Sequence, residues 1–518
     1  MAPANNRGLF HMSASAQADP YARAAAKFAL AAKLASIECL LDWDAQTNMP
    51  KGGAWARGEQ LGALAEVTSD ITAAAEVGAL LDEAQGYADK LEEADRANLA
   101  EMRRLYAHHA AVPKALLIER ARVSQALQAV WIEAKANSDW KAFAPGFKQL
   151  MAIHKEVAAA KSVALGLKPY DAMMDEDDPG LTTAKIDPIF DDLAGYLPGL
   201  LQEVRERQAK WPAVIPFEGD FSIPRQELLS QRMALVVGHS PETSRIDTAP
   251  HPFSMIHSPG DVRFTTRYSE DKFRYSLTAT LHEAGHSMYE LNLPRKLAFS
   301  PVGTARGMSV HESQSLMLEM MAGRSKEFLR FLAPFVGDFL GQGQPCWSRV
   351  NMLNLFRRLD DDYIRVNADE ISYPLHVILR YRLEQALLKG DLAVDDVPGA
   401  WNELFTKLFG RTPPNHAKGC LQDIHWAAAL FGYFPNYALG EALAAQLFER
   451  ATTDDRSILP ALEKGDFKPY FAWVKPRIHE QASLHDFDDL VVAATGEKLS
   501  AAALKRHLKK RYLEEPLD

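Results

Sequence analysis

The chain has 518 residues, of which 47% are hydrophobic, and a formal net charge of −10 with a sequence pI near 5.9. A chain of this length and apolar content can bury one very large core or two merged subdomains. The acidic balance disfavours binding to a phosphate backbone, so we expect no nucleic-acid partner.

Cysteine is scarce, with only Cys39, Cys346 and Cys420. An odd, dispersed set predicts neither a disulfide framework nor a cysteine-type zinc site, and it is typical of a reducing compartment. No apolar run is long enough to span a bilayer, and residues 1–16 lack the apolar core of a secretory signal. We therefore expect a cytoplasmic protein with no membrane partner and a disordered extension over residues 1–14.

Helical patterns follow one another along the chain from Tyr21. Ala, Leu, Glu, Lys and Arg recur with an apolar spacing near 3.6, and Pro- and Gly-containing breaks interrupt the pattern at 49–53, 112–113 and 178–180. The spacing predicts helices over 21–45, 55–85, 89–110, 113–137, 140–166, 184–209, 225–237, 274–292, 309–333, 346–365, 373–388, 397–408, 438–451 and 458–475.

The β signal is confined to residues 251–268. Two short segments, 251–255 and 262–268, are rich in aromatic or β-branched residues and are separated by a turn sequence that contains Pro259 and Gly260. This pattern predicts a β-hairpin or small sheet. The fold expected from the whole pattern is mainly α, a single helical domain over residues 15–518 with one small sheet.

The most informative motif is His282-Glu283-Ala284-Gly285-His286. On a helix, positions i and i+4 lie on one face, so both imidazoles can reach one tetrahedral Zn²⁺, and Glu283 lies where its carboxylate can take a proton from a metal-activated water. Gly285 is costly inside a helix, which suggests that a close approach is needed there. The alternative is a fortuitous pair of core histidines. The motif predicts a zinc hydrolase, with Co²⁺ or Mn²⁺ as possible substitutes for Zn²⁺.

A third protein ligand is expected from the next helix. Glu312 begins a helix after the Pro- and Gly-containing loop 294–307, so the chain can return antiparallel to the first helix. Ser309 and Glu312 also form a capping-box pattern, in which Glu312 would only satisfy the helix N-terminus. Glu319, two turns later, is a rival ligand.

Several further motifs occur in a fixed order. They are His251-Pro252-Phe253, Asp261-Val262-Arg263-Phe264-Thr265, the motif at 282–286, His311-Glu312-Ser313-Gln314, Ile364-Arg365-Val366-Asn367-Ala368-Asp369 and Gly419-Cys420-Leu421-Gln422-Asp423-Ile424-His425-Trp426. With them the chain resembles the carboxypeptidase Taq family of zinc metallo-carboxypeptidases over roughly residues 20–515, and the active-site motifs fall within 251–440. The resemblance implies a large helical zincin-type fold with a deep substrate groove, a homodimer, and removal of C-terminal residues from peptides with broad side-chain tolerance. It also implies Glu312 as the third ligand.

An exopeptidase has to recognise the free terminal carboxylate of its peptide. Arg365 is the first candidate, because a guanidinium matches a carboxylate bidentately, and Arg263 is the second. The alternatives are a structural ion pair of Arg365 with Asp369 and of Arg263 with Asp261. The predicted hairpin, with His251 at its start, is expected either to bind the extended peptide along an edge strand or merely to close the groove.

Donors near the metal would stabilise the oxyanion that forms when water attacks the peptide carbonyl. We expect His425 and Tyr433 in this catalytic role, with Tyr437 as a further phenolic group that contacts substrate. The alternative for each tyrosine is a core position with a satisfied hydroxyl. Asp423 is expected to orient a neighbouring imidazole.

Two other functions stay open at this point. An endo-acting oligopeptidase on a similar scaffold would cut internally and would ignore C-terminal amidation. A zinc-stabilised helical binding protein would need no general base and would close the fourth metal position with another side chain, which the presence of Glu283 disfavours.

Overall fold

The computed structural model describes residues 19–516 apart from 250, 342–343 and 361, with the backbone alone at 256–257. The extension expected at residues 1–14 lies outside the described residues. Backbone contacts divide the chain into two compact units, Met1–Ala111 with Pro294–Thr304 and Val112–Leu293 with Ala305–Asp518. No helix within the described ranges has the length and apolar character needed to cross a membrane.

The first unit contains four α-helices among its described residues, and residues of the first, third and fourth form one small apolar core. Asp19 caps the first helix by accepting a hydrogen bond from the Ala22 amide, and the core contains Phe28, Leu80 and Met102. The four are α1 (Pro20–Thr47), α2 (Ala54–Thr72), α3 (Ala75–Gln85) and α4 (Glu93–Ala111). The single helix predicted over 55–85 is thus two helices, because the chain takes an extended step at Ala74 that no breaker residue marks.

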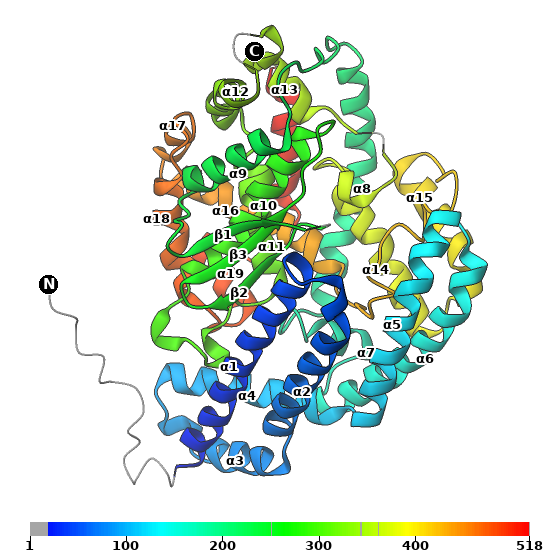
Figure 1. Ribbon diagram of the computed structural model, residues 1–518, viewed down its shortest axis with the longest axis vertical. Helices are drawn as coiled ribbons and strands as arrows, with labels where there is room; N and C mark the ends of the chain where they lie inside the picture. The colour runs from blue at the N-terminus through cyan, green and yellow to red at the C-terminus, as the bar shows by residue number, and fades with distance from the viewer. Residues whose placement is uncertain (1–18, 250, 342–343, 361, 517–518) are drawn as a thin grey trace, which may run out of the picture. The chain divides into compact units, whose positions relative to one another are not determined.

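The second unit is also mainly helical and contains the only sheet among the described residues (Figure 1). Its helices are α5 (Lys114–Asn137), α6 (Trp140–Leu165), α7 (Pro169–Met174), α8 (Thr183–Gln208), α9 (Ile223–Val237), α10 (Phe273–Leu291), α11 (Met308–Leu316), α12 (Lys326–Leu340), α13 (Arg349–Arg357), α14 (Tyr373–Lys389), α15 (Val397–Phe409), α16 (Pro435–Asp454), α17 (Ile458–Leu462), α18 (Lys468–Arg477), α19 (Phe487–Thr495) and α20 (Ala502–Lys509). The mainly helical fold class predicted from the sequence is confirmed.

Several predicted helices are shorter than the apolar spacing suggested. The helix predicted over 309–333 is divided into α11, a π-helical turn over Met317–Ala322 (η5) and α12, whose N-cap is Ser325. The helix predicted over 458–475 breaks around Gly465, whose φ of 70° is left-handed. Helices α7, α19 and α20 were not predicted.

The sheet has three strands, β1 (Ser244–Thr248), β2 (Ser254–Ser258) and β3 (Asp261–Thr266), in the order β1-β3-β2. The antiparallel pair of β2 and β3 confirms the predicted hairpin, although β2 begins later than expected. Strand β1 pairs in parallel with β3 and was not predicted. Val262 and Phe264 of β3 are buried, and β3 packs on α10.

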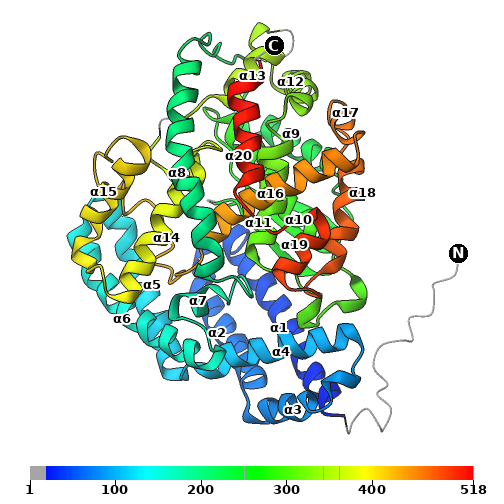
Figure 2. The same ribbon diagram turned by 180° about the vertical axis from the view of Figure 1, so that it is seen from behind.

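The centre of the second unit is a stack of helices. Helix α10 packs against α9 and β3 and also against α11, and α11 packs in turn on α16, which contacts α20. Figures 1 and 2 show α10, α11 and α16 close together from both directions. Most residues of α10, α11 and α16 are buried, and α10 packs on α11, so the motifs at 282–286 and 311–314 lie against each other inside the unit.

Candidate metal centre and active site

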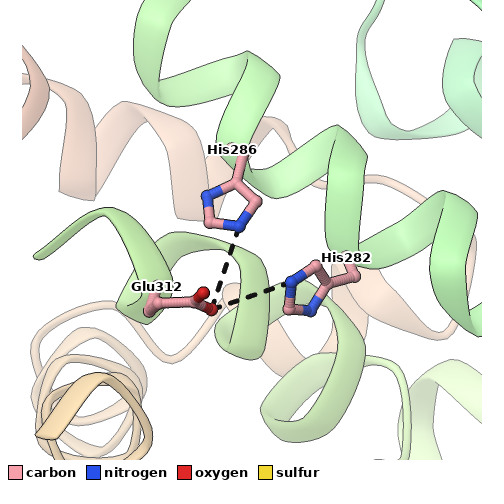
Figure 3. Close-up of side chains that lie close together, drawn as sticks. All are labelled: His282, His286 and Glu312. Carbon is pink, nitrogen blue, oxygen red and sulfur yellow. Dashed lines mark ion pairs between the residues drawn. The ribbon is translucent and has the colours of Figure 1, made fainter. Parts of the chain in front are cut away.

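Helix α10 carries both histidines of the 282–286 motif on one face. Because they are four residues apart, their side chains project one turn apart, and the ring centroids of His282 and His286 lie 5.0 Å from each other. Glu283 and His286 are buried, whereas His282 is partly exposed. Figure 3 shows the two imidazoles pointing toward the side chain of Glu312.

Helix α11, which carries Glu312, begins after Gly307, whose φ of 120° is accessible to glycine. Asp178 caps this helix from a distant segment, since its carboxylate accepts hydrogen bonds from the Ser309 amide at 3.0 Å and the Ser309 hydroxyl at 2.5 Å. Ser309 is therefore bound to Asp178, and the capping-box arrangement with Glu312 is not formed. The Glu312 carboxylate faces the imidazoles instead.

The three side chains converge on one point. Oε2 of Glu312 lies 3.7 Å from Nε2 of His282 and 3.8 Å from Nε2 of His286, and one ligand atom of each residue lies within 4.8 Å of the other two. Ligands held at zinc distances in a tetrahedron are about 3.4 Å apart. Two imidazole nitrogens and a carboxylate oxygen at these separations fit a zinc ion with only small side-chain adjustments.

Glu319, the rival ligand, lies on the other side of the His282 ring. Its Oε2 accepts a hydrogen bond from Nδ1 of His282 at 2.9 Å, and Arg324 donates to its Oε1 at 3.3 Å. Burial by itself would lower the pKa of His282, but the hydrogen bond to Glu319 and the fields of Glu312 and Glu283 raise it to about 10. The carboxylates around this imidazole therefore make a strongly negative site that favours a cation.

Glu283 is held from the sheet. The Ser254 hydroxyl, at the start of β2, donates a hydrogen bond to Oε2 of Glu283 at 2.7 Å. Burial raises the pKa of Glu283, while His282 and the Ser254 hydrogen bond oppose the rise. No sequence pattern indicates Ser254, because its contact with Glu283 depends on how the sheet packs against α10.

A cavity of about 570 Å³ lies over these side chains. A second cavity of about 510 Å³ adjoins it and shares Tyr275, Thr278 and Glu319 with its lining. His251 and Arg365, which the sequence singled out, line the first cavity, as do Tyr433 and Tyr437.

His425 does not line this cavity but lies behind Tyr437, with its Nε2 3.1 Å from the Tyr437 hydroxyl. The tyrosine hydroxyls are thus closer to the cavity than the imidazole. Burial raises the pKa of Tyr433 well above its usual value, and the pKa of Tyr437 is raised for the same reason, so both phenols stay protonated and can donate. Tyr275 and Tyr373, which the sequence analysis missed, line the same cavity, so four tyrosines belong to its lining.

Arg365 is held by Asp423. The Nε and Nη2 groups of Arg365 donate to Oδ1 of Asp423 at 3.2 and 3.1 Å, and Nε of Arg380 donates to Oδ2 at 2.7 Å. Two guanidinium groups share one carboxylate, which leaves a net positive charge beside the cavity. Asp423 therefore orients arginines, and the expectation that it orients an imidazole was wrong. Asp369 caps α14 through Ser372 and does not pair with Arg365.

Arg263 has a different environment. Its Nε and Nη2 groups both donate to the Asp261 carboxylate at 2.8 Å, in a fork-like pair within β3. Arg263 is absent from the lining of the cavity, whereas its neighbour Val262 is present. The structure therefore brings Arg365, but not Arg263, to the cavity that His282, His286 and Glu312 line.

Two imidazoles and a carboxylate that converge on one point, with a glutamate beside them, are typical of zinc-dependent peptidases. The profile described as carboxypeptidase Taq (M32) metallopeptidase matches residues 23–512. The chain belongs to this family and is a metallo-carboxypeptidase.

Relatives and solved structures agree with this assignment. The chain is 35% identical to thermostable carboxypeptidase 1 of Thermus thermophilus over 93% of this chain and 96% of the relative, and 32% identical to carboxypeptidase 1 of Bacillus subtilis over 91% and 94%. Metallocarboxypeptidase 1 of Trypanosoma cruzi superposes with a TM-score of 0.93 at 36% identity, covering 96% of this chain and 99% of that one. The Pyrococcus furiosus carboxypeptidase gives 0.91 at 29% identity, covering 96% and 99%.

Proposed function

We propose that the protein is a zinc-dependent carboxypeptidase that hydrolyses the last peptide bond of its substrates. The observation that carries this proposal is the convergence of His282, His286 and Glu312 on one point beside Glu283. A zinc ion bound there would activate a water molecule and polarise the scissile carbonyl. The same donor set also accepts Co²⁺ or Mn²⁺, so metal analysis has to identify the ion.

Glu283 is proposed as the general base. Its carboxylate accepts a hydrogen bond from Ser254, which fixes its direction beside the imidazoles. It would take the proton from the attacking water and later give that proton to the leaving amine. The Tyr433 and Tyr437 hydroxyls would donate to the oxyanion, and His425 would act through Tyr437, whose hydroxyl it contacts.

Arg365 is proposed to bind the terminal carboxylate of the peptide. Its Nη1 group is not engaged by Asp423, and the guanidinium packs over the Tyr437 ring at 4.7 Å, which fixes its plane. Strand β2 is an edge strand that begins at the cavity, so main-chain pairing along it would hold a peptide without reading its side chains. Broad tolerance of the C-terminal residue follows from that mode of binding.

Two broader properties complete the proposal. A homodimer is implied by the family resemblance and is checked by light scattering. A cytoplasmic location is supported by the net charge of −10 and by Cys39, Cys346 and Cys420, all of which are free thiols.

One experiment tests the central proposal. A peptide with a free C-terminus and the same peptide with an amidated C-terminus are incubated with the protein, with and without a chelator, and the products are followed by mass. We expect stepwise loss of C-terminal residues from the free peptide alone, abolished by the chelator. Internal cleavage of both peptides would instead identify an endo-acting oligopeptidase, and intact peptides with stoichiometric zinc would identify a binding protein.

A further inference from the structure

The two histidines of α10 are held differently at the ring nitrogen that faces away from Glu312. Nδ1 of His282 meets the Glu319 carboxylate directly. Nδ1 of His286 lies 2.5 Å from Nδ1 of His311, and Nε2 of His311 lies 2.8 Å from Oε1 of Glu290. A second imidazole therefore separates His286 from the carboxylate behind it.

The proton positions in this chain follow from the contacts. A metal at Nε2 of His286 requires a lone pair there, which places the proton of the neutral ring on Nδ1. That N–H has to donate to Nδ1 of His311, so His311 must be neutral with its own proton on Nε2. The Nε2–H of His311 then points at Glu290, which can only accept. One arrangement of protons satisfies every contact.

Any other placement of these protons breaks one of the contacts. If His311 carried its proton on Nδ1, it would donate to His286 and force the His286 proton onto Nε2, where it would block a metal. Without an acceptor at Glu290, the two neutral forms of His311 would be close in energy. His286 is only 8% exposed while His311 covers its Nδ1, so in the intact protein the acceptor is His311 and not water.

We propose that His311 and Glu290 are positioning residues, which fix His286 in the tautomer whose Nε2 lone pair faces Glu312. This inference rests on the proposed metal centre and adds two residues to it. Their partners support the geometry, since Tyr289 packs on the His311 ring with centroids 5.3 Å apart. Glu290 lies one turn beyond His286 on α10, and His311 directly precedes Glu312 on α11. The hydrogen-bonded chain His286–His311–Glu290, called the relay below, therefore joins the two helices that carry the proposed ligands.

The His311 ring, which lies between His286 and Glu290, also limits the negative charge close to the proposed metal. Glu283, Glu312 and Glu319 already surround His282. A carboxylate bound directly to His286 would place a fourth negative charge only one imidazole away from the proposed metal. The His311 ring lies between them instead, with its centroid 4.6 Å from that of His286, so the Glu290 charge is further from the metal. The relay therefore supplies orientation with less charge than a direct carboxylate.

The test compares zinc affinity in purified variants by competition with a chelator of known affinity. His311→Ala removes the acceptor and should weaken Zn²⁺ binding roughly 10- to 100-fold, the usual effect of losing an outer partner of a metal ligand. His311→Asn places an amide oxygen close to the former Nδ1 and should recover most of that loss. Equal weakening by the alanine and asparagine variants, or none by either, would overturn the proposal.

Glu290 provides an independent arm. Because it acts only through His311, Glu290→Ala should weaken zinc binding by itself but should add little when combined with His311→Ala. Additive effects in the double variant would show that Glu290 acts on the site separately and would contradict the relay.

His239→Asn is the matched control. This buried imidazole also contacts α10, with Nε2 3.2 Å from the Ala284 carbonyl oxygen, and it makes no hydrogen bond to either ligand ring. We expect a lower Tm with unchanged zinc affinity; a loss equal to that of His311→Ala would mean that general packing, and not the tautomer, sets the affinity. Failure of the wild-type protein to bind zinc would remove the proposed metal centre together with the relay.

Discussion

A Cβ atom at Gly285 would lie 2.4 Å from the backbone carbonyl oxygen of Gln314. Helices α10 and α11 therefore approach as closely as their backbones permit, at the level of the two histidines. A similar contact exists on the other side of α11, where a Cβ at Gly440 would lie 2.5 Å from the Cβ of Glu312. Because the two glycines have no side chain, α11 can pack closely between α10 and α16. This close packing brings Glu312 to His282 and His286.

Gly285→Ala should separate α10 from α11. The new methyl group meets backbone atoms that cannot rotate away, so we expect a loss of about 2–3 kcal/mol in the free energy of unfolding. Because Glu312 would move away from the imidazoles, zinc affinity should fall at least about tenfold. Urea unfolding of the metal-free protein and chelator competition measure the two effects separately.

Gly199→Ala is the control for that variant. Gly199 lies inside α8, and a Cβ there would meet no atom within 4 Å. The substitution should stabilise the protein by roughly 0.5–1 kcal/mol, because alanine loses less backbone entropy in a helix. If Gly285→Ala behaved like Gly199→Ala, close packing would not be the reason for glycine in the motif.

The sequence predicted the part of the site that lies on one helix. The four-residue spacing of His282 and His286 is a local property, and the cost of glycine in a helix correctly indicated close packing at Gly285. The spacing of residues in the sequence could not decide whether Glu312 or Glu319 is the third candidate ligand. It depends on where α11 begins, which Asp178 decides from far away in the sequence, and on the π-helical turn that carries Glu319.

Contacts made between elements were the ones that the sequence missed. Ser254 reaches Glu283 only because β2 packs beside α10, and Asp423 meets Arg365 and Arg380 only after distant segments fold together. Neither pairing has a periodicity or a spacing that reveals it. Apolar periodicity predicted most helices well and failed where a turn of different pitch or a left-handed glycine interrupts it, as at Gly465.

Arg365→Ala should reduce kcat/KM for peptides with a free C-terminus by roughly 10- to 100-fold, which corresponds to the loss of hydrogen bonds between charged groups. Amidated peptides, which lack that charge, should be cleaved poorly by both proteins and should show no further loss. Steady-state kinetics on the two peptides gives the comparison. Arg263→Ala is the control, because its guanidinium is paired with Asp261, and we expect a change of less than about threefold. An equal loss on free and amidated peptides would rule out the carboxylate role of Arg365.

Glu283→Gln should keep zinc and lose hydrolysis. The amide preserves the size of the side chain and can still accept a hydrogen bond from Ser254, but it cannot take a proton. We expect kcat to fall by at least about 100-fold, at the lower end of what a positioned general base contributes. Metal content is measured on the same preparation, and turnover near the wild-type value at full zinc occupancy would show that another group is the base.

Glu384, which lies next to the segment that carries His425, should make the free energy of unfolding depend on pH. Its buried carboxylate accepts hydrogen bonds from the Tyr170 hydroxyl at 2.8 Å, the Trp426 indole at 2.9 Å and the Gly432 amide at 3.0 Å. It thereby anchors the segment that carries His425. Burial raises the pKa of Glu384 to about 7, although the three hydrogen bonds oppose the rise.

The sign of the effect follows from the proton balance. The folded protein keeps the Glu384 proton up to about pH 7, whereas the unfolded chain releases it near the ordinary pKa of a glutamate, so the folded state binds more protons between these values. The free energy of unfolding should therefore fall by up to about 3 kcal/mol as the pH rises from about 4.5 to about 7. Glu384→Gln cannot ionise and should lack this part of the slope. Urea unfolding of both proteins at several pH values measures the difference between them, and a difference that stays constant from pH 5 to pH 7.5 would show that Glu384 is ionised in the folded protein throughout.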